Sequence, residues 1–364
     1  MFSSRIGRTT GAIAVVSALA LSGCGGQETE SAATDLSVVT STNVYADIVA
    51  QVAGEHAEVE PIIDDPNQDP HSYEATSQDR LKLSKADLVV QNGGGYDSFM
   101  TTMLEASDAQ AEVIDTVAIS GLPGSEGVAN EPHSHGEEGE SSEPSAGGHV
   151  HEAEGHSHEA EGHSHESEGH SHETEGHTHE TEGHDHGPFN EHLWYSVPTM
   201  TTLVDEVALH LGEALPEHKD DFTANAAKYK ETLGELQSQI DSAKKSHGGE
   251  KVAATEPVPL WLFEDMGLEN VVSSEFLSAV EEGNDVPPLV LREAEDQISS
   301  GEVVLLGYNT QAAGPQAEAL KATAEKSNVP VVDLAETMPA DTHYAQWMGA
   351  YITDITDALE GHDH

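Results

Sequence analysis

A seven-residue repeat in the middle of the chain sets the first limit on the fold. From Gly148 the units GHVHEAE, GHSHEAE, GHSHESE, GHSHETE and GHTHETE follow one another, and GHDHGP ends the run. A period of seven is typical of coiled coils, but these units contain glycine and have no apolar a/d pair. Such a segment cannot bury enough apolar surface to offset its ordering entropy. We therefore predict a disordered insertion over residues 122–188, with the folded parts on either side of it.

The same repeat is rich in metal-binding side chains. Residues 133–186 hold 14 of the 23 histidines in the chain, mostly as H-x-H pairs. Neutral imidazole is the commonest ligand for Zn, Cu and Ni, and neighbouring glutamates add oxygen ligands. A segment without fixed geometry predicts several exchangeable sites rather than one preformed cage. The expected secondary ligands are His156, His158, His163, His165, His170, His172, His177, His179, His184 and His186.

The segments that flank the insertion alternate between strand and helix patterns. Before the insertion, LSVVTST, AEVEPII and DLVVQ have the composition of strands, and helical patterns separate them. After it, KVAATEP, EVVLLGYN and VPVVDLA are predicted strands, and YAQWMGAYITDITDALE is a terminal helix. This alternation favours an α/β fold with a largely parallel sheet in each half. The glycines of NGGGYD follow a predicted strand, and we interpret them as a strand-end loop rather than a phosphate-binding loop.

One long helix is predicted between the two halves. Apolar residues spaced four, three, four, three and four apart form a single stripe over residues 216–247, namely Phe222, Ala226, Tyr229, Leu233, Leu236 and Ile240. This helix would rigidly bridge an N-terminal lobe, 36–215, and a C-terminal lobe, 248–360. A short histidine-containing tail, 361–364, follows. Two such lobes leave the cleft outside the strand ends as the expected ligand site.

The N-terminal residues predict export and a lipid anchor. Two arginines precede GAIAVVSALALSG, an apolar stretch too short to span a bilayer, which is the layout of a secretory signal over 1–23. The motif LSGC ends at Cys24, the only cysteine, and resembles a bacterial lipobox in which that cysteine carries lipid. Residues 24–35 would form a polar tether. We expect an extracytoplasmic protein anchored to the outer face of the bacterial cell membrane.

The charge balance limits the partners. The formal net charge is −53, with 14 basic against 67 acidic residues. Nucleic acid requires clustered positive charge, so a nucleic-acid partner is excluded. A single thiol also excludes an internal disulfide, so that stability depends on packing. We expect a monomer.

Metal ligands with a fixed geometry are expected in the loops that follow predicted strands. His71 lies in DPHSYEATSQD, and His192 lies in NEHLWY, directly after the insertion. Glu256 in ATEPVP and Glu336 in DLAETMP each follow a predicted strand. An acid at a strand end is commonly a helix cap, so the local pattern alone does not select either glutamate.

The order of these motifs resembles the metal-binding lipoproteins of zinc and manganese ABC importers, the ZnuA/PsaA/TroA-like solute-binding proteins. The resemblance spans about residues 36–358 and rests on the lipobox, DPHSYEATSQD, KADLVVQNGGGYD, EHLWY and YAQWMGAY. It implies two α/β lobes bridged by a rigid helix, with one metal between them and an ABC permease and its ATPase as partners. The implied ligands are His71, His192, Glu256 and Glu336, with Asp333, Asp341 and His343 as alternatives for the last position.

The identity of the metal stays open between two ions. Zinc members of the family usually have a histidine where this chain has Glu256, and manganese members have a glutamate. The imidazole-rich insertion favours Zn²⁺ by ligand softness, so we expect Zn²⁺, with Mn²⁺ or Fe²⁺ as the alternative. A metallohydrolase is disfavoured because the chain has no H-E-x-x-H motif. A secreted metal-sequestering or adhesive protein without a permease remains a further alternative.

Overall fold

The computed structural model describes residues 36–107, 109–128 and 189–362. The predicted signal peptide, Cys24, the tether, residues 129–188 with all ten repeat histidines named above, and the last two residues lie outside the described part of the chain. Among the described residues, no helix combines the length and apolarity that crossing a membrane requires.

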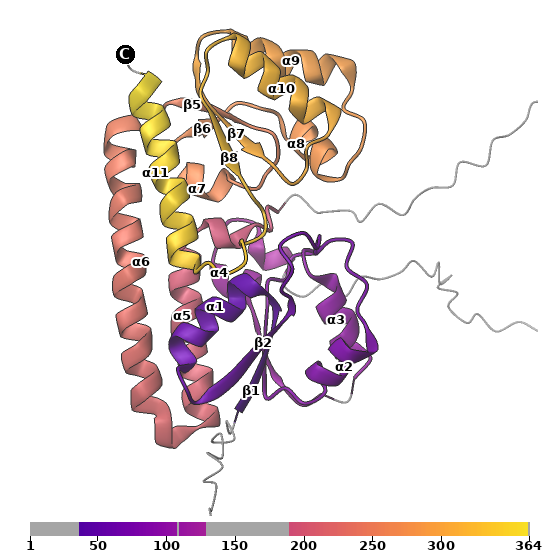
Figure 1. Cartoon of the computed structure of the whole chain (residues 1–364), viewed down its shortest axis with the longest axis vertical. Helices are drawn as coiled ribbons and strands as arrows, with labels where there is room; N and C mark the ends of the chain where they lie inside the picture. The colour runs from indigo at the N-terminus through magenta and orange to yellow at the C-terminus, as the bar shows by residue number, and fades with distance from the viewer. Residues whose placement is uncertain (1–35, 108, 129–188, 363–364) are drawn as a thin grey trace, which may run out of the picture. The chain divides into compact units, whose positions relative to one another are not determined.

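The N-terminal sheet is parallel, with the strand order β2-β1-β3-β4. Its strands are β1 (Leu36–Thr42), β2 (Ala57–Ile63), β3 (Leu88–Gln91) and β4 (Glu112–Asp115). The connections contain the helices α1 (Asn43–Ala53), α2 (Ser77–Leu83), α3 (Ser98–Glu105) and α4 (Thr116–Ser120). Successive residues of β1 serve opposite faces: Val38 packs in the cluster that contains α1, and Val39 packs in the one that contains α2 and α3. Helices therefore cover both faces of this sheet, as Figure 1 shows.

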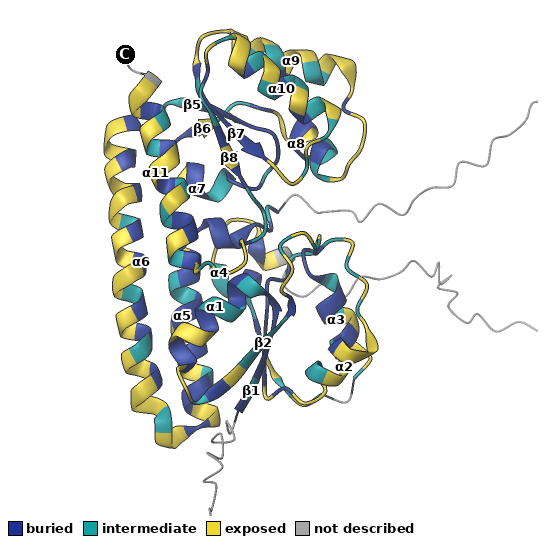
Figure 2. Cartoon of the chain, viewed as in Figure 1, coloured by how far each residue is buried: buried dark blue, intermediate teal, exposed yellow. Residues whose placement is uncertain are grey.

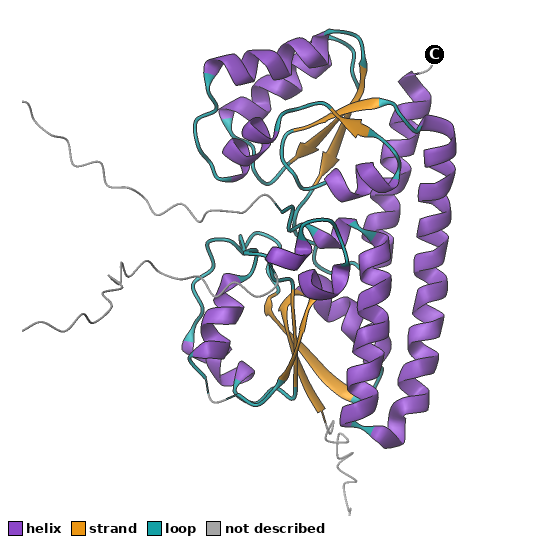
Figure 3. Ribbon diagram, turned by 180° about the vertical axis from the view of Figure 1, so that it is seen from behind, coloured by secondary structure: helices purple, strands orange, loops and turns teal. Residues whose placement is uncertain are grey.

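The C-terminal sheet repeats this topology. Its order is β6-β5-β7-β8, again all parallel, so that both sheets place their first strand between the second and third. The strands are β5 (Lys251–Ala254), β6 (Glu269–Asn270), β7 (Val303–Asn309) and β8 (Val331–Leu334). The helices are α7 (Leu260–Asp265), α8 (Ser274–Glu281), α9 (Pro288–Ser299), α10 (Pro315–Lys326) and α11 (Tyr344–His362). The predicted α/β fold with two parallel sheets is confirmed (Figure 3).

The long helix α6 (Lys219–His247) packs against helices from both lobes. All six residues of the predicted stripe are buried, and its other faces are largely exposed (Figure 2). Its main partners are α1, α11 and α5 (Val197–Ala214), which leads into it through the 3-10 helix η3 (Pro216–His218). The helix α5 forms the second half of this helical pair and is absent from the elements predicted above.

The predicted start of the disordered insertion at residue 122 is wrong. Residues up to Val128 are described, and Ser125–Gly127 form the 3-10 helix η1. Leu122 and Val128 pack against the apolar core, and Ser125 is buried. These contacts come from apolar side chains, which extend the ordered part of the chain beyond the predicted boundary.

Candidate metal centre

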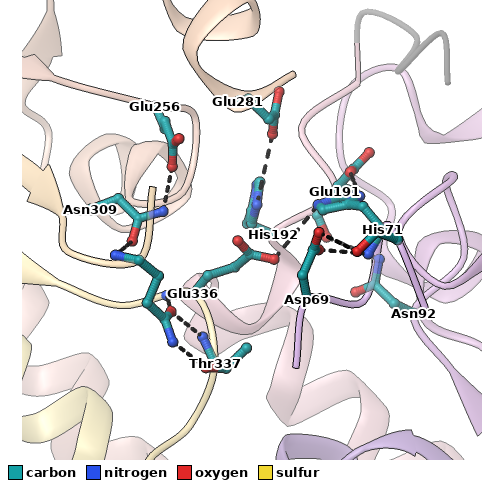
Figure 4. A network of polar contacts seen from close by, with 12 residues as sticks. Asp69, His71, Asn92, Glu191, His192, Glu256, Glu281, Asn309, Glu336 and Thr337 are labelled. Atoms are coloured by element: carbon teal, nitrogen blue, oxygen red, sulfur yellow. Dashed lines mark hydrogen bonds and ion pairs between the residues drawn. The ribbon is translucent and has the colours of Figure 1, made fainter. Parts of the chain in front are cut away.

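The four predicted ligands line one cavity. It has a volume of about 780 Å³, and His71, His192, Glu256 and Glu336 all contribute to its wall (Figure 4). His71 follows β2, whereas Glu256 follows β5 and Glu336 follows β8. Parallel strands gather the residues after their carboxyl ends at one edge, so each sheet presents its loops to this cavity.

A short turn positions His71. The carboxylate of Asp69 accepts hydrogen bonds from the His71 amide at 2.9 Å and from the Ser72 hydroxyl at 2.7 Å. The imidazole then lies between two acids, with Nδ1 3.3 Å from Glu191 Oε1 and Nε2 3.6 Å from Glu336 Oε1. His71 thus contacts a carboxylate of each lobe.

Asn190 orients the imidazole of His192, which is only 1% exposed. Asn190 Oδ1 lies 2.8 Å from His192 Nδ1 and accepts from the His192 amide at 3.1 Å. An amide oxygen only accepts, so Nδ1 carries the proton and a metal would bind through Nε2. That nitrogen lies 3.8 Å from Glu281 Oε1.

The NGGG loop supports the segment that carries His192. Asn92 Nδ2 donates to the backbone oxygen of Glu191 at 3.0 Å. The amides of Asn92 and Gly93 donate to the carboxylate of Asp97, at 2.6 and 2.9 Å. Burial raises the pKa of Asp97 to about 6. The loop amides are occupied by a carboxylate of the chain itself, which agrees with a strand-end loop and not with a phosphate-binding loop.

The C-terminal lobe contributes two glutamates whose pKa values are raised. Glu256 is 2% exposed and accepts a hydrogen bond from Asn309, yet burial raises the pKa of Glu256 to about 7. The Glu336 amide donates to Gln311 Oε1 at 2.7 Å. Burial first, and then the neighbouring carboxylates led by Glu256, raise the pKa of Glu336 to about 8. A divalent cation would relieve this repulsion.

Three of the four residues form a close group. One ligand atom from each of His71, His192 and Glu336 lies within 4.8 Å of the others. Glu256 lines the same cavity but is not in this group. Its Oε1 is buried and has no hydrogen-bond partner among the residues that the structure describes.

The alternatives for the last position lie elsewhere. Asp333 pairs with Lys321 at 3.4 Å and is largely exposed. His343 is 71% exposed and contacts Asp47 at 2.7 Å, and Asp341 lies in an exposed turn. None of the three lines the cavity.

Two further glutamates contact the imidazoles and were missed in the sequence. Glu191 is buried next to His192, and Glu281 is the last residue of α8. A charged residue two positions before the buried LWY run was the available signal for Glu191. Glu281 had none, because its EEG context has the pattern of an exposed helix end. Glu281 lines the cavity together with Glu256 and Glu336, and this acidic wall favours a cationic ligand.

The two lobes also contact each other around the cavity. Asn190 Nδ2 donates to Pro257 O at 3.0 Å, and Trp261 Nε1 donates to Asn190 O at 2.9 Å. On another side, Gln311 Nε2 donates to Pro66 O at 2.9 Å and Thr337 Oγ1 to the same oxygen at 2.6 Å. The ligand-bearing loops of both lobes therefore support one another.

Comparison with known proteins identifies the family. Residues 38–358 match the family of ZnuA, the zinc-uptake complex component A, periplasmic. The chain belongs to this family. Within it, the chain is 26% identical over 221 residues to the manganese-binding lipoprotein MntA of Bacillus subtilis (strain 168), covering 59% of this chain and 52% of the relative. It is also 26% identical over 228 residues to the zinc-binding lipoprotein AdcA of Streptococcus pneumoniae (strain ATCC BAA-255 / R6), covering 62% and 35%. The chain thus spans about half or less of the length of these curated relatives.

Solved structures share the fold of the ZnuA family. A crystal structure of ZnuA has a TM-score of 0.61 at 17% identity, covering 89% of this chain and 99% of that one. The periplasmic zinc-binding protein TroA from Treponema pallidum has a TM-score of 0.60 at 18% identity, with coverage of 89% and 99%. The resemblance inferred from the motifs is confirmed, and the family comprises substrate-binding proteins of importers rather than enzymes.

Proposed function

We propose that this protein captures a divalent cation, Zn²⁺, in the cavity and delivers it to an ABC permease driven by its ATPase. A lipid on Cys24 would hold it at the outer face of the cell membrane. The observation that carries the proposal is the close group of His71, His192 and Glu336, which joins two imidazoles of one lobe to an acid of the other.

The proposed ligands are His71, His192, Glu256 and Glu336. Two neutral imidazoles and two carboxylates balance the charge of one divalent cation. Glu256 would join this group after an approach of its lobe or a side-chain rotation, and its buried Oε1, which has no hydrogen-bond partner among the described residues, lies in the cavity wall. Release then follows when small shifts displace the ligands of one lobe, since the other lobe alone retains only half of the shell.

The choice between Zn²⁺ and Mn²⁺ depends on how many oxygens enter the shell. Two nitrogens and two oxygens suit tetrahedral Zn²⁺, and the imidazole-rich insertion supports the same ion. Mn²⁺ is the second candidate, and the contacts of Glu191 with His71 and of Glu281 with His192 favour it. These two glutamates could complete the oxygen-rich, higher-coordinate shell that harder cations prefer.

The histidine-rich insertion is proposed to collect metal near the cavity by raising its local concentration. Deletion of residues 133–186 should leave one tight equivalent in place and remove only additional, weaker ones. Since imidazoles must be neutral to bind metal, those weaker equivalents should decline below about pH 6.5. Unchanged stoichiometry at pH 5 would count against this role.

Calorimetric titration of His71→Ala tests the proposal. The variant should lose tight one-to-one binding, whereas the control His343→Ala, outside the cavity, should bind as the parent does. Elemental analysis of protein purified without added metal, followed by competition between Zn²⁺ and Mn²⁺, separates the two ions. Equal affinity of His71→Ala and the parent would refute the site.

A metal-sequestering or adhesive protein without a permease is the remaining alternative function. Neighbouring genes for an ATPase and a membrane permease would support import. Cellular uptake of Zn²⁺ that is unaffected by loss of the protein would support sequestration or adhesion instead.

A further inference from the structure

A second group of metal-binding side chains lies outside the cavity. One ligand atom from each of His56, His218 and Asp221 lies within 4.8 Å of the others. His56 belongs to the turn between α1 and β2, His218 ends η3, and Asp221 lies in the first turn of α6. Two chain segments distant in sequence therefore bring two imidazoles and a carboxylate together.

This group is separated from the cavity by the length of a strand. His56 immediately precedes β2, and the cavity loop that begins at Pro66 follows it. The strand has seven residues, so at about 3.3 Å per residue the two places lie roughly 20 Å apart along it. None of the three side chains lines the cavity. A cation bound to them would be additional to the transported ion.

The distances within the group suit a tetrahedral cation. Asp221 Oδ2 lies 3.3 Å from His56 Nε2 and 3.4 Å from His218 Nδ1. When metal–ligand bonds are about 2.0–2.1 Å, neighbouring ligand atoms of a tetrahedral zinc site are about 3.3–3.4 Å apart. These two separations therefore already match two edges of such a site.

Aromatic packing holds the two imidazoles next to each other. The rings of His56 and His218 stack at 3.8 Å with an interplanar angle of 23°. Phe222, which is fully buried, presents its edge to both rings, at 5.6 and 6.5 Å. The pair is thus anchored to the core of the N-terminal lobe, and its nearly parallel rings must tilt apart for both nitrogens to bind one cation.

We propose that His56, His218 and Asp221 form a second site for Zn²⁺ or another borderline divalent cation. Its two nitrogen ligands select against Mg²⁺ and Ca²⁺. The Asp221 side chain is 60% exposed, so water can complete the shell. With three ligands and open solvent access, the site binds more weakly than the cavity. A cation there joins the α1–β2 turn to the turn between α5 and α6, and so braces the end of the lobe opposite the cavity.

Residue-resolved footprinting of the full chain tests this site despite the many histidines of the insertion. Diethyl pyrocarbonate modifies free imidazoles, and peptide mass spectrometry reports each histidine separately. Free Zn²⁺ is set with a metal buffer from the micromolar to the millimolar range. His56 and His218 should become protected together, with one common midpoint. Full reactivity of both at every Zn²⁺ concentration would overturn the proposal.

Matched variants separate this site from a general effect of zinc. Asp221→Asn should move the midpoint by about tenfold or more, whereas Asp220→Asn, the adjacent acid in the same helical turn, should not. His56→Gln should abolish the protection of His218, because the remaining two ligands bind poorly. His71→Ala should leave both protections unchanged, which distinguishes this site from the cavity. An equal midpoint in Asp221→Asn and Asp220→Asn, or retained protection of His218 in His56→Gln, would refute it.

Discussion

The phenol of Tyr195 donates a hydrogen bond to the backbone oxygen of Ala335 at 2.7 Å, across the two lobes. Tyr195 lies three residues after His192, and Ala335 immediately precedes Glu336. The ring is fully buried and stacks on Tyr351 at 6.0 Å with an interplanar angle of 9°. This bond therefore fixes the segment that carries an imidazole against the one that carries an acid.

Replacement of Tyr195 by Phe should weaken metal binding without removing a ligand. A buried hydrogen bond contributes about 0.5–1.5 kcal/mol, so the metal affinity should fall by roughly two- to twelvefold with the stoichiometry unchanged. Calorimetric titration measures both quantities. Tyr308→Phe is the control, since its phenol bonds Glu318 within the C-terminal lobe. Equal losses of metal affinity in the two variants would show that the effect is a general destabilisation of the fold.

Loss of Asn190 should affect the cavity through the orientation of His192. Asn190→Ala removes the acceptor for Nδ1, and such supporting contacts typically contribute 10–100-fold to metal affinity, so we expect a loss of about tenfold or more. Asn190 also donates to Pro257 between the lobes. Asn190→Asp keeps an acceptor for the imidazole but loses that donor, so it should recover much of the affinity if orientation dominates. Affinity in Asn190→Ala equal to that of the parent would contradict this role.

The sequence predicted the scaffold better than the cavity, for a physical reason. Strand patterns and the apolar stripe of α6 depend only on residues close in sequence. The six stripe residues between Phe222 and Ile240 are buried at the predicted spacing. The convergence of His71, His192 and Glu336 depends on how two sheets face each other, which no local pattern contains. Those residues were identified through the family resemblance.

Of the features that the sequence did not predict, one had a recognisable sequence pattern and one had none. The helix α5 has buried residues at helical spacing, including Met200, Leu203, Val207 and Leu211, and could have been predicted. Glu281 could not, because its low exposure arises only when α8 packs beside the cavity. Residues whose function depends on tertiary contact alone require the structure.

The close approach of Gly93 to Asp115 makes a further stability prediction. Gly93 has a φ of +80°, and a Cβ there would lie 2.5 Å from the Asp115 carboxylate. Gly93→Ala should lower the free energy of unfolding by about 2–4 kcal/mol, since backbone strain and a steric clash add. Gly121→Ala is the matched control, with a φ of +63° but no atom within 4 Å of its Cβ, so it should lose only about 1 kcal/mol. Denaturant melts measure the difference, and equal losses would place the effect in the backbone angle alone.

The raised pKa of Glu336 should make the stability of the metal-free protein depend on pH. The ordinary value is 4.5, and the folded protein holds the proton up to a pKa of about 8. Folded protein therefore binds more protons than unfolded protein between these values, so the free energy of unfolding should fall as the pH rises from about 4.5 to about 8. The stabilisation by protonated Glu336 is fully present below that window and lost above it. The pKa of Glu256, raised to about 7, acts in the same direction.

Urea melts of metal-free protein across this window test the effect of Glu336. Glu336→Gln is neutral at every pH. The free energy of unfolding of this variant should therefore change less over the window than that of the parent, by on the order of 2–4 kcal/mol. Glu302→Gln is the control, because Lys251 lowers the pKa of that exposed acid and keeps it ionised throughout. Saturating metal should also flatten the parent curve, since a cation binds the deprotonated carboxylates and displaces the proton. Parallel curves for the parent and Glu336→Gln over the same window would show that Glu336 is charged in the metal-free cavity, and the proton could then not be exchanged for the metal.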